Sequence, residues 1–311
     1  LDGDTDGHYD PAPCATDAHD CAELRASVAF GETAGLLQVL TDGSAVDHLV
    51  IHGNKTARRA TTAGAECAAG HNAYGYNLRL ACDGKTVTRD ALCGTGCEVS
   101  GLRQGITVWQ SAVLYNGIHD ASGLWADGLT VHDAVDSIFV DNVFVDNTDV
   151  DLIFGGCVRC LIQGNDLTHS AAFAGGSFAA LMLHAWSTTS GDYTGSLTSD
   201  NTIDCGPDRR CGIGLYIGSD AWYDTDTFGG TVQDNTVSRA EFGLLIDDAH
   251  DMAVHDNAVS DSGTSTQASC GTKSTYNYGM GTDSVNIHTA GDGVSYAAVD
   301  FDGCIPNWWN P

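Results

Sequence analysis

The fold of this chain is decided by two similar stretches, Ile162-Gln163-Gly164-Asn165-Asp166-Leu167 and Val232-Gln233-Asp234-Asn235-Thr236-Val237. In each stretch, Gly or Asp and then Asn stand between apolar residues. The same pattern recurs at residues 51–54, 140–143, 197–203 and 254–259. In the copies from residue 140 onward, successive asparagines lie 23, 36, 34 and 22 residues apart. They are Asn142, Asn165, Asn201, Asn235 and Asn257.

These intervals are typical of a solenoid, in which a short interval is one coil and a longer one is a coil with a loop insertion. Asn tolerates left-handed backbone and can hydrogen-bond within its own turn, and stacked Asn side chains form ladders. We therefore predict an all-β chain folded as a right-handed parallel β-helix, with the five asparagines in equivalent turns. The alternative is an antiparallel sandwich, but its two-residue hairpin turns are few here.

A second series of apolar segments falls between the Asn positions, at residues 127–131, 150–154, 180–184, 214–217 and 243–247. We predict that these are equivalent strands of one parallel sheet, with matching residues about 4.8 Å apart on successive coils. Residues 1–45 are turn-rich and are predicted to cap the solenoid. The β-helix is then expected over residues 46–290, with 291–311 as a C-terminal tail of the same domain.

The chain has 12 cysteines, an even number, which favours an oxidising compartment and disulfide bonds. Because the chain begins at Leu1, we expect an upstream signal peptide and a secreted protein. The cysteines are predicted to pair locally, which would tie down both termini, as Cys14/Cys21, Cys67/Cys82, Cys93/Cys97, Cys157/Cys160, Cys205/Cys211 and Cys270/Cys304. The alternative is a zinc site built from Cys93, Cys97, Cys157 and Cys160.

The chain is strongly acidic, with 13 basic and 41 acidic residues and a net charge of −28. This charge argues against nucleic acid as a partner and disfavours polyanionic substrates that no cation bridges. The sequence contains no run of eighteen apolar residues, so we expect no membrane-spanning segment. The oligomeric state stays open.

The densest group of chemically active residues consists of Asp127, Asp149 and Asp151. Asp127 lies 22 and 24 residues before the other two, which is about one coil, so the three carboxylates are expected on neighbouring rungs. Clustered carboxylates raise one another's pKa, and glycosidases use such a pair as acid and base. The alternative is that these residues only cap turns.

The repeat over about residues 45–290 resembles the pectin-lyase-like β-helix superfamily. Its Asp arrangement resembles β-helical glycoside hydrolases, namely polygalacturonases and the α-1,3-glucanases called mutanases, which carry one Asp on one coil and an Asp pair on the next. Asp127 matches the single position, whereas Val150 separates Asp149 from Asp151. The resemblance implies a secreted endo-acting hydrolase that acts on a polysaccharide or oligosaccharide, with these three residues as catalytic groups.

A second resemblance concerns Val150-Asp151-Leu152-Ile153-Phe154-Gly155, which is similar to a strand of pectin methylesterases. It implies an esterase with Asp151 as nucleophile and Asp127 as acid. The Gln before the first Asp of that family is Ala126 here, and its Arg is missing from residues 219–221. A lyase of the same fold would need Lys or Arg near the cluster, where only Arg159 is close, and a non-catalytic surface or adhesion module is a further alternative.

Aromatic and polar side chains near the same strands are predicted to bind sugar, because rings stack on sugar faces and polar groups bond the hydroxyls. These substrate-binding candidates are His119, Trp125, His184, Trp186, Tyr216, Trp222, Asp247 and Asp248, of which the last two are also a rival catalytic pair.

The first ten residues resemble the calcium loops of thrombospondin-type and dockerin-type repeats, since Asp2, Asp4, Asp6 and Asp10 alternate with Gly and other residues. The resemblance implies a structural Ca²⁺ bound by these four carboxylates. Pro13 stands where an EF-hand would place Glu. No cofactor is expected for catalysis.

Overall fold

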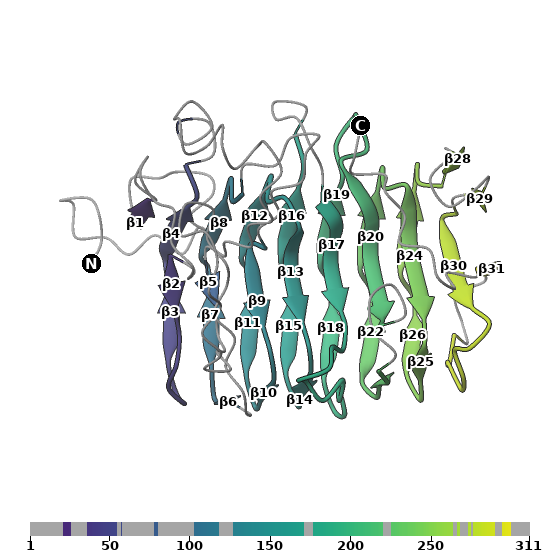
Figure 1. The fold of residues 1–311 in the computed structure, drawn as a ribbon, viewed down its shortest axis with the longest axis horizontal. Helices are drawn as coiled ribbons and strands as arrows, with labels where there is room; N and C mark the ends of the chain where they lie inside the picture. The colour runs from purple at the N-terminus through teal and green to yellow at the C-terminus, as the bar shows by residue number, and fades with distance from the viewer. Residues whose placement is uncertain are drawn as a thin grey trace.

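The computed structural model describes residues 21–25, 36–54, 57, 78–79, 103–117, 127–170, 177–219, 225–263, 266–267, 273–274, 276–289 and 294–299. Over these ranges the chain winds through three long sheets, called A, B and C here, whose neighbouring strands are all parallel. Figure 1 shows successive coils side by side along the long axis.

Sheet A consists, in spatial order, of β1 (Ala22–Arg25), β4 (Leu49–His52), β8 (Ala112–Leu114), β12 (Val143–Val145), β16 (Asp166–Thr168), β19 (Thr202–Asp204), β23 (Thr236–Ser238) and β27 (Ala258–Ser260). Sheet C consists of β3 (Ala45–Asp47), β7 (Thr107–Trp109), β11 (Ile138–Val140), β15 (Leu161–Gln163), β18 (Leu197–Ser199), β22 (Thr231–Gln233) and β26 (Ala253–His255).

Sheet B consists of β2 (Leu37–Gln38), β5 (Leu78–Arg79), β9 (Leu129–Val131), β13 (Val150–Phe154), β17 (Ser177–Leu183), β20 (Cys211–Gly218), β24 (Phe242–Asp247), β30 (Tyr278–Gly281) and β31 (Ala297–Val299). Three small sheets complete the described strands: β6 (Arg103–Gln104), β10 (Ala134–Val135) and β14 (Cys157–Val158); β21 (Thr227–Phe228) and β25 (Ala249–His250); and the antiparallel pair β28 (Thr266–Gln267) and β29 (Lys273–Ser274).

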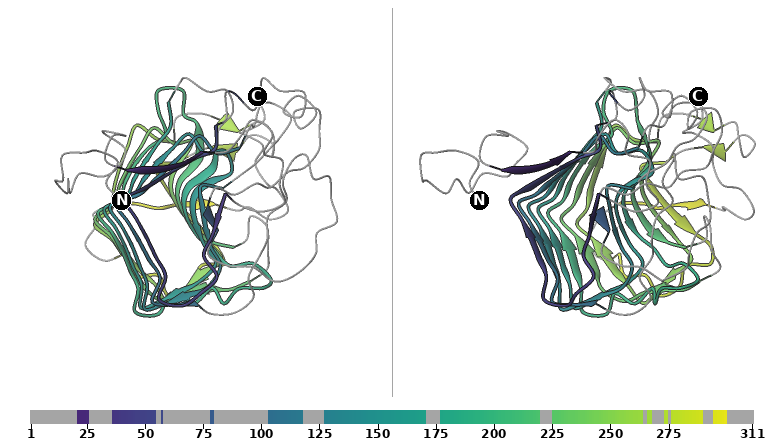
Figure 2. Two further views of the ribbon diagram at one scale, coloured as in Figure 1. Left: turned by 90° about the vertical axis from the view of Figure 1, so that its left-hand side faces the viewer. Right: turned by 60° about the vertical axis from the view of Figure 1, so that its left-hand side comes forward.

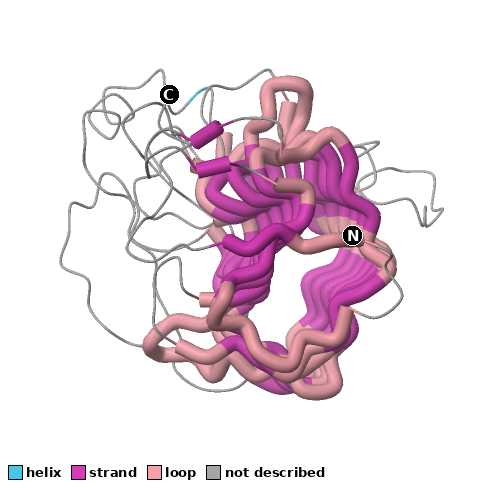
Figure 3. Tube along the Cα trace, turned by 90° about the vertical axis from the view of Figure 1, so that its right-hand side faces the viewer, coloured by secondary structure: helices cyan, strands magenta, loops and turns pink. Residues whose placement is uncertain are grey.

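Each coil passes from sheet C through sheet A to sheet B, as in β11, β12 and β13, and the next coil repeats the path one rung further. Figures 2 and 3, viewed toward the ends of the solenoid, show the strands stacked around a common interior. The predicted right-handed parallel β-helix is therefore confirmed. Strands β1 and β2 join sheets A and B ahead of residue 45, and β31 continues sheet B beyond residue 290.

The interior is filled by rows of apolar side chains, one residue per coil. In sheet B, Leu129, Leu152, Leu181, Leu215 and Leu244 are in register, and all five are fully buried. The predicted second series is thus one parallel sheet, as expected. Burying a Leu side chain contributes about 1.5–3 kcal/mol, so each added coil stabilises the stack.

The turn between sheet C and sheet A, called the ladder turn here, carries the predicted asparagines. Asn201 shows the arrangement: its Oδ1 accepts from the backbone N of Asn165 at 3.0 Å and from Asn165 Nδ2 at 2.8 Å, while its own Nδ2 donates to the carbonyl oxygen of Ile162 at 3.0 Å. The same bonds link all five positions, which are buried, so this prediction is confirmed.

One detail of the turn prediction is wrong. The left-handed backbone belongs to the residue before each ladder Asn, as at Asp200 with φ 57° and Gly164 with φ 65°, because the Asn itself must point inward to bond its neighbours. Asn54, in the first copy of the pattern, is not one of the five predicted positions; it follows β4 of sheet A and lies in a different turn.

Two predicted disulfides, Cys157–Cys160 and Cys205–Cys211, are present, with Cα–Cα distances of 5.6 and 5.1 Å. The zinc alternative is wrong for Cys157 and Cys160, because the two sulfurs bind each other. Cys21 is also disulfide-bonded. Cys14 and the pairs Cys67/Cys82, Cys93/Cys97 and Cys270/Cys304 lie outside the described residues. Within the described part of the chain, no helix is long and apolar enough to cross a membrane.

Candidate active site

The candidate carboxylates lie where the chain leaves sheet A and enters sheet B, a turn called the site turn here. The pairing of β9 with β13 sets Leu129 beside Leu152, and this register places Asp127 beside Val150. The backbone N of Val150 donates to Asp127 Oδ1 at 3.2 Å, and the backbone N of Gly128 donates to the Val150 carbonyl oxygen at 2.8 Å. Asp149 and Asp151 therefore flank the residue that Asp127 contacts.

Asp127 is held by hydrogen-bond donors on both carboxylate oxygens. Besides the Val150 amide on Oδ1, the Thr130 hydroxyl donates to Oδ2 at 2.6 Å, and Asn116 Nδ2 donates to the Asp127 carbonyl oxygen. The residue is 5% exposed. Donors aimed at both oxygens favour the ionised form of this carboxyl.

Asp149 has the opposite environment. It is partly buried, and its carbonyl oxygen accepts from the backbone N of Phe178 on the next coil at 2.7 Å. Burial, and secondly the nearby Asp127 carboxylate, raise the pKa of Asp149 well above its ordinary value. A buried carboxyl beside a like charge keeps its proton at a pH where an exposed Asp has lost it.

Gly128 makes this close approach of the two coils possible. A Cβ at this position would collide with the carbonyl oxygen of Asp151 and would lie 2.9 Å from Asn147 Nδ2. A larger residue would therefore push β9 away from β13 at the point where Asp127 meets Val150.

Asp151, the third predicted catalytic residue, takes part in a different set of contacts. It is 0% exposed. Its Oδ1 accepts from Asn147 Nδ2 at 3.0 Å and from the Asn147 backbone N at 3.3 Å, and its Oδ2 lies 2.6 Å from His169 Nε2. This carboxylate supports the backbone around Asp149 from within and offers no face to solvent.

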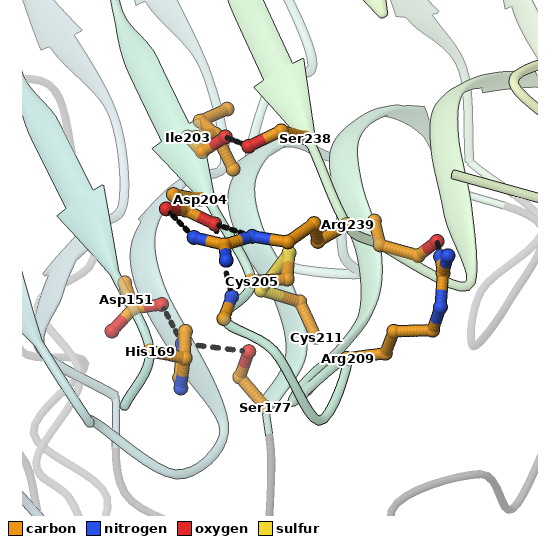
Figure 4. Close-up of a disulfide and its surroundings, with 12 residues drawn as sticks. Asp151, His169, Ser177, Ile203, Asp204, Cys205, Arg209, Cys211, Ser238 and Arg239 are labelled. Carbon is orange, nitrogen blue, oxygen red and sulfur yellow. Dashed lines mark hydrogen bonds and ion pairs between the residues drawn. A yellow bond between two sulfur atoms is a disulfide. The ribbon is translucent and has the colours of Figure 1, made fainter. Parts of the chain in front are cut away.

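His169 and Ser177 are site residues that the sequence interpretation missed. His169 Nε2 lies 3.2 Å from Ser177 Oγ as well as near Asp151, and its Nδ1 lies 3.8 Å from Asp146 Oδ1. Figure 4 shows Asp151, His169 and Ser177 converging from neighbouring coils. The only signal in the sequence was their place at the site turn, since His169 directly follows β16 and Ser177 begins β17.

These three residue types also occur in hydrolase triads, but their geometry here is different. In a triad the Asp and the Ser contact opposite nitrogens of the imidazole, so that the ring can take a proton from the Ser. Here both contact Nε2. A carboxylate accepts, so this geometry is satisfied when Nε2 donates to Asp151, and a donating Nε2 has no lone pair with which to accept a proton from Ser177.

Three predicted substrate-binding residues gather at the opposite, carboxyl end of sheet B. The rings of His184 and Trp186 are 5.8 Å apart, those of His184 and Tyr216 are 6.3 Å apart, and Trp186 also packs edge-on against His132 at 4.8 Å. His184 follows Phe178, the neighbour of Asp149, by six residues of extended strand, or about 20 Å. These rings therefore pack against one another, and His184 lies far from the Asp127 and Asp149 carboxylates.

His184 donates from Nδ1 to the carbonyl oxygen of Gly218 at 2.6 Å. Burial lowers the pKa of His184 to about 4, against the opposing effect of this hydrogen bond. The imidazole is therefore neutral at neutral pH. His184, Trp186 and Tyr216 are all buried, which makes them packing groups of this sheet end in the present structure.

The rival pair Asp247 and Asp248 ends β24. Asp247 is 1% exposed, and a Cβ on Gly281 of the next coil would collide with its Oδ1, so the carboxylate occupies space that this glycine leaves. Asp248 is partly buried with φ 50°, and its Oδ2 accepts from the Ser219 hydroxyl at 3.0 Å. The two side chains of this pair have separate surroundings.

Several predicted positions lie outside the described residues: His119, Trp125, Trp222, and the calcium candidates Asp2, Asp4, Asp6 and Asp10. The structural Ca²⁺ stays a prediction. Within the described ranges, no group of three or more His, Cys, Asp or Glu side chains is arranged to hold a metal ion.

No protein-family model matches this chain, and no curated protein matches it. Among solved structures, the chain is similar to the surface adhesin PfbA of Streptococcus pneumoniae, with a TM-score of 0.40 and 11% identity over 82% of this chain and 59% of the adhesin. It is also similar to the A-module of mannuronan C-5 epimerase AlgE6 of Azotobacter vinelandii, with a TM-score of 0.38 and 11% identity over 85% of this chain and 70% of the module.

This chain spans less than two thirds of the adhesin's length. Likenesses this distant do not establish a shared function, and the β-helix is shown by the strand pairing itself.

Proposed function

We propose that this β-helix is a secreted glycoside hydrolase in which Asp149 is the general acid and Asp127 the general base or nucleophile. The observation that carries the proposal is the contrast between the two carboxyls. Hydrogen-bond donors aimed at both oxygens of Asp127 favour its ionised form, while burial and the nearby Asp127 carboxylate raise the pKa of Asp149. Two neighbouring carboxyls pushed toward opposite protonation states are what acid–base cleavage of a glycosidic bond requires.

In this reaction the Asp149 proton moves to the glycosidic oxygen as its bond to the anomeric carbon breaks. Asp127 removes a proton from the water that forms the new bond to that carbon, or attacks the carbon itself before water releases the sugar. The separation of the two carboxyl groups from each other in the bound state decides between inversion and retention. Both routes use the same two residues.

The esterase and lyase alternatives receive less support. The nucleophile that the esterase resemblance implies, Asp151, is 0% exposed and its oxygens accept from Asn147 and His169, whereas the proposed acid Asp149 is only partly buried. A lyase needs a basic side chain beside the substrate. Arg159, the nearest Arg in sequence, is instead bonded to Asp136 through both Nε and Nη2, at 2.6 and 2.9 Å.

A neutral polysaccharide fits the chain better than a polyuronate, because a net charge of −28 repels an anionic polymer. A non-catalytic surface module would have the same fold as the proposed hydrolase, but it would cleave no polysaccharide.

The proposal is tested by incubating the protein with a panel of neutral and acidic polysaccharides. We expect new reducing ends without the ultraviolet absorbance of an unsaturated sugar. Absorbance that grows with chain cleavage would identify a lyase, and acid release without new reducing ends would identify an esterase. Binding to a polysaccharide without any cleavage would identify a non-catalytic module.

A further inference from the structure

The buried residue His169 contacts residues of two neighbouring coils close to Asp149, the proposed acid. It is 5% exposed and follows β16 of sheet A. Its ring lies between Asp151 on one nitrogen and Asp146 on the other, with Ser177 beside the first. Asp146 and Asp151 belong to one coil, and His169 and Ser177 to the next, so the imidazole fastens the two coils together at the site turn.

Asp151 connects His169 to the backbone around Asp149. Its Oδ1 bonds both the side chain and the backbone N of Asn147, which closes a five-residue turn with Asp149 at its centre. Its other oxygen receives His169 Nε2 at 2.6 Å. The position of Asp149 therefore depends on a carboxylate whose second oxygen is satisfied by the imidazole.

We propose that His169 is a positioning residue, which acts through Asp151 and Asn147 to hold the Asp149 carboxyl against Asp127. The role in turnover rests on the function proposed above, whereas the effect on Asp149 rests on the contacts alone. Without the imidazole, Oδ2 of the buried Asp151 carboxylate loses its donor and must recruit water or move. Either change loosens the turn of residues 147–151 and moves Asp149 toward water and away from Asp127.

Two variants of His169 separate positioning from general support of the fold. The amide nitrogen of Gln reaches about where His Nε2 lies and can donate to Asp151, whereas Leu fills a similar volume without a donor. We therefore expect His169→Gln to retain the position of Asp149 and His169→Leu to lose it. His255 provides a matched control, because it also contacts an Asp, at 2.8 Å from Asp256, but at the ladder turn.

The measurement is an NMR titration of the side-chain carboxyl carbon of Asp149. Its resonance is assigned as the one that is missing from the spectrum of Asp149→Asn. In the wild type this carboxyl titrates well above the ordinary range; in His169→Leu we expect a fall of about one pH unit or more. His169→Gln and His255→Leu should titrate like the wild type. A folded His169→Leu with an unchanged Asp149 titration would overturn the proposal.

If His169→Leu does not fold, Asp151→Asn replaces it, because this change keeps the shape of the side chain and removes the charged acceptor of the imidazole. An unchanged Asp149 titration in that variant would equally overturn the proposal. If the wild type cleaves no polysaccharide while these shifts appear, the proposed hydrolase is wrong and the positioning role stands. If it does cleave, His169→Leu should also lower kcat more than it raises KM.

Discussion

The ladder turn and the site turn recur once per coil, but they are built from different residues. The ladder turn repeats one residue, Asn, on five consecutive coils, and each side chain bonds the next in the same way. The site turn changes from coil to coil: the residues that directly follow sheet A on four successive coils are Asp146-Asn147, His169-Ser170, Cys205-Gly206 and Arg239-Ala240. Figure 4 shows contacts around these turns that differ from an amide ladder, namely the ion pair of Arg239 with Asp204, the contact of His169 with Asp151 and the Cys205–Cys211 disulfide.

The contrast between the two turns indicates which part of the solenoid is suited to an active site. A neutral amide ladder is fully satisfied and adds the same stability on every coil. Charged groups that vary between coils create local environments, such as the one in which burial and the nearby Asp127 carboxylate raise the pKa of Asp149.

The largest expected effect is on the rate of polysaccharide cleavage, which should depend on the site turn and not on the ladder turn. We predict that Asp149→Asn lowers the rate of polysaccharide cleavage by about 100- to 10,000-fold, because a general acid contributes about that much. The exposed Asp234 of a ladder turn is the control, and Asp234→Asn should leave the rate unchanged. Reducing-end assays under saturating substrate check this, and a rate loss that is equal in both variants would contradict it.

The ladder turn should instead respond in stability. Asn201→Ala removes bonds to both neighbouring coils and leaves buried amide groups unsatisfied, at about 1–3 kcal/mol for each group, so we expect a loss of about 3 kcal/mol. Asn257→Ala, at the last ladder position, should cost less, because its Nδ2 donates only to the carbonyl oxygens of Val232 and His255 and so links it to no further ladder Asn. Denaturant unfolding measures both, and equal losses would show that the ladder is not cooperative along its length.

A smaller effect concerns stability as a function of pH at the site turn. The folded-state pKa of Asp149 is raised above its ordinary value of 3.8, so the folded chain binds this proton more tightly than the unfolded chain. Asp149 then costs no stability below pH 3.8 and an increasing amount as the pH rises through the folded-state pKa. Asp149→Asn should therefore match the wild type at about pH 3 and melt at a higher temperature at pH 7. A variant that is less stable at pH 7 would contradict the raised pKa.

The smallest effect is expected at an exposed ion pair outside both turns. Arg159 bonds Asp136 through two nitrogens, but both side chains face water, where salt screens the attraction. Arg159→Ala should change the melting temperature less than any variant above, and the small difference should vanish in 1 M salt. A large loss of stability would show that the small sheet around β14 needs this pair.

The fold could be predicted because the ladder residues repeat with an almost constant coil length. The intervals of 22 and 23 residues that end at Asn257 and Asn165 reveal one coil each, and the leucines of sheet B follow the same rhythm. The sequence did not reveal which residue of the turn takes the left-handed backbone, since Asp200 and Asn201 are both suited to it.

The candidate site could be predicted only in part. Coil length placed Asp127, Asp149 and Asp151 on neighbouring rungs, but it carries no information on which way a side chain points. Asp151 therefore looked equivalent to Asp149, although it turns inward to His169. His184 was assigned to the same groove because spacing identifies the rung of a residue and not its distance along the strand, which here is about 20 Å.

The pH dependence of kcat/KM on a cleaved polysaccharide tests the central claim, an acid–base pair of Asp149 and Asp127, most directly. An acid–base pair predicts a bell-shaped profile, whose alkaline limb comes from loss of the Asp149 proton at a pKa well above the ordinary value of 3.8. In Asp149→Asn the residual activity should show no alkaline limb. An alkaline limb that persists unchanged in this variant would contradict the account.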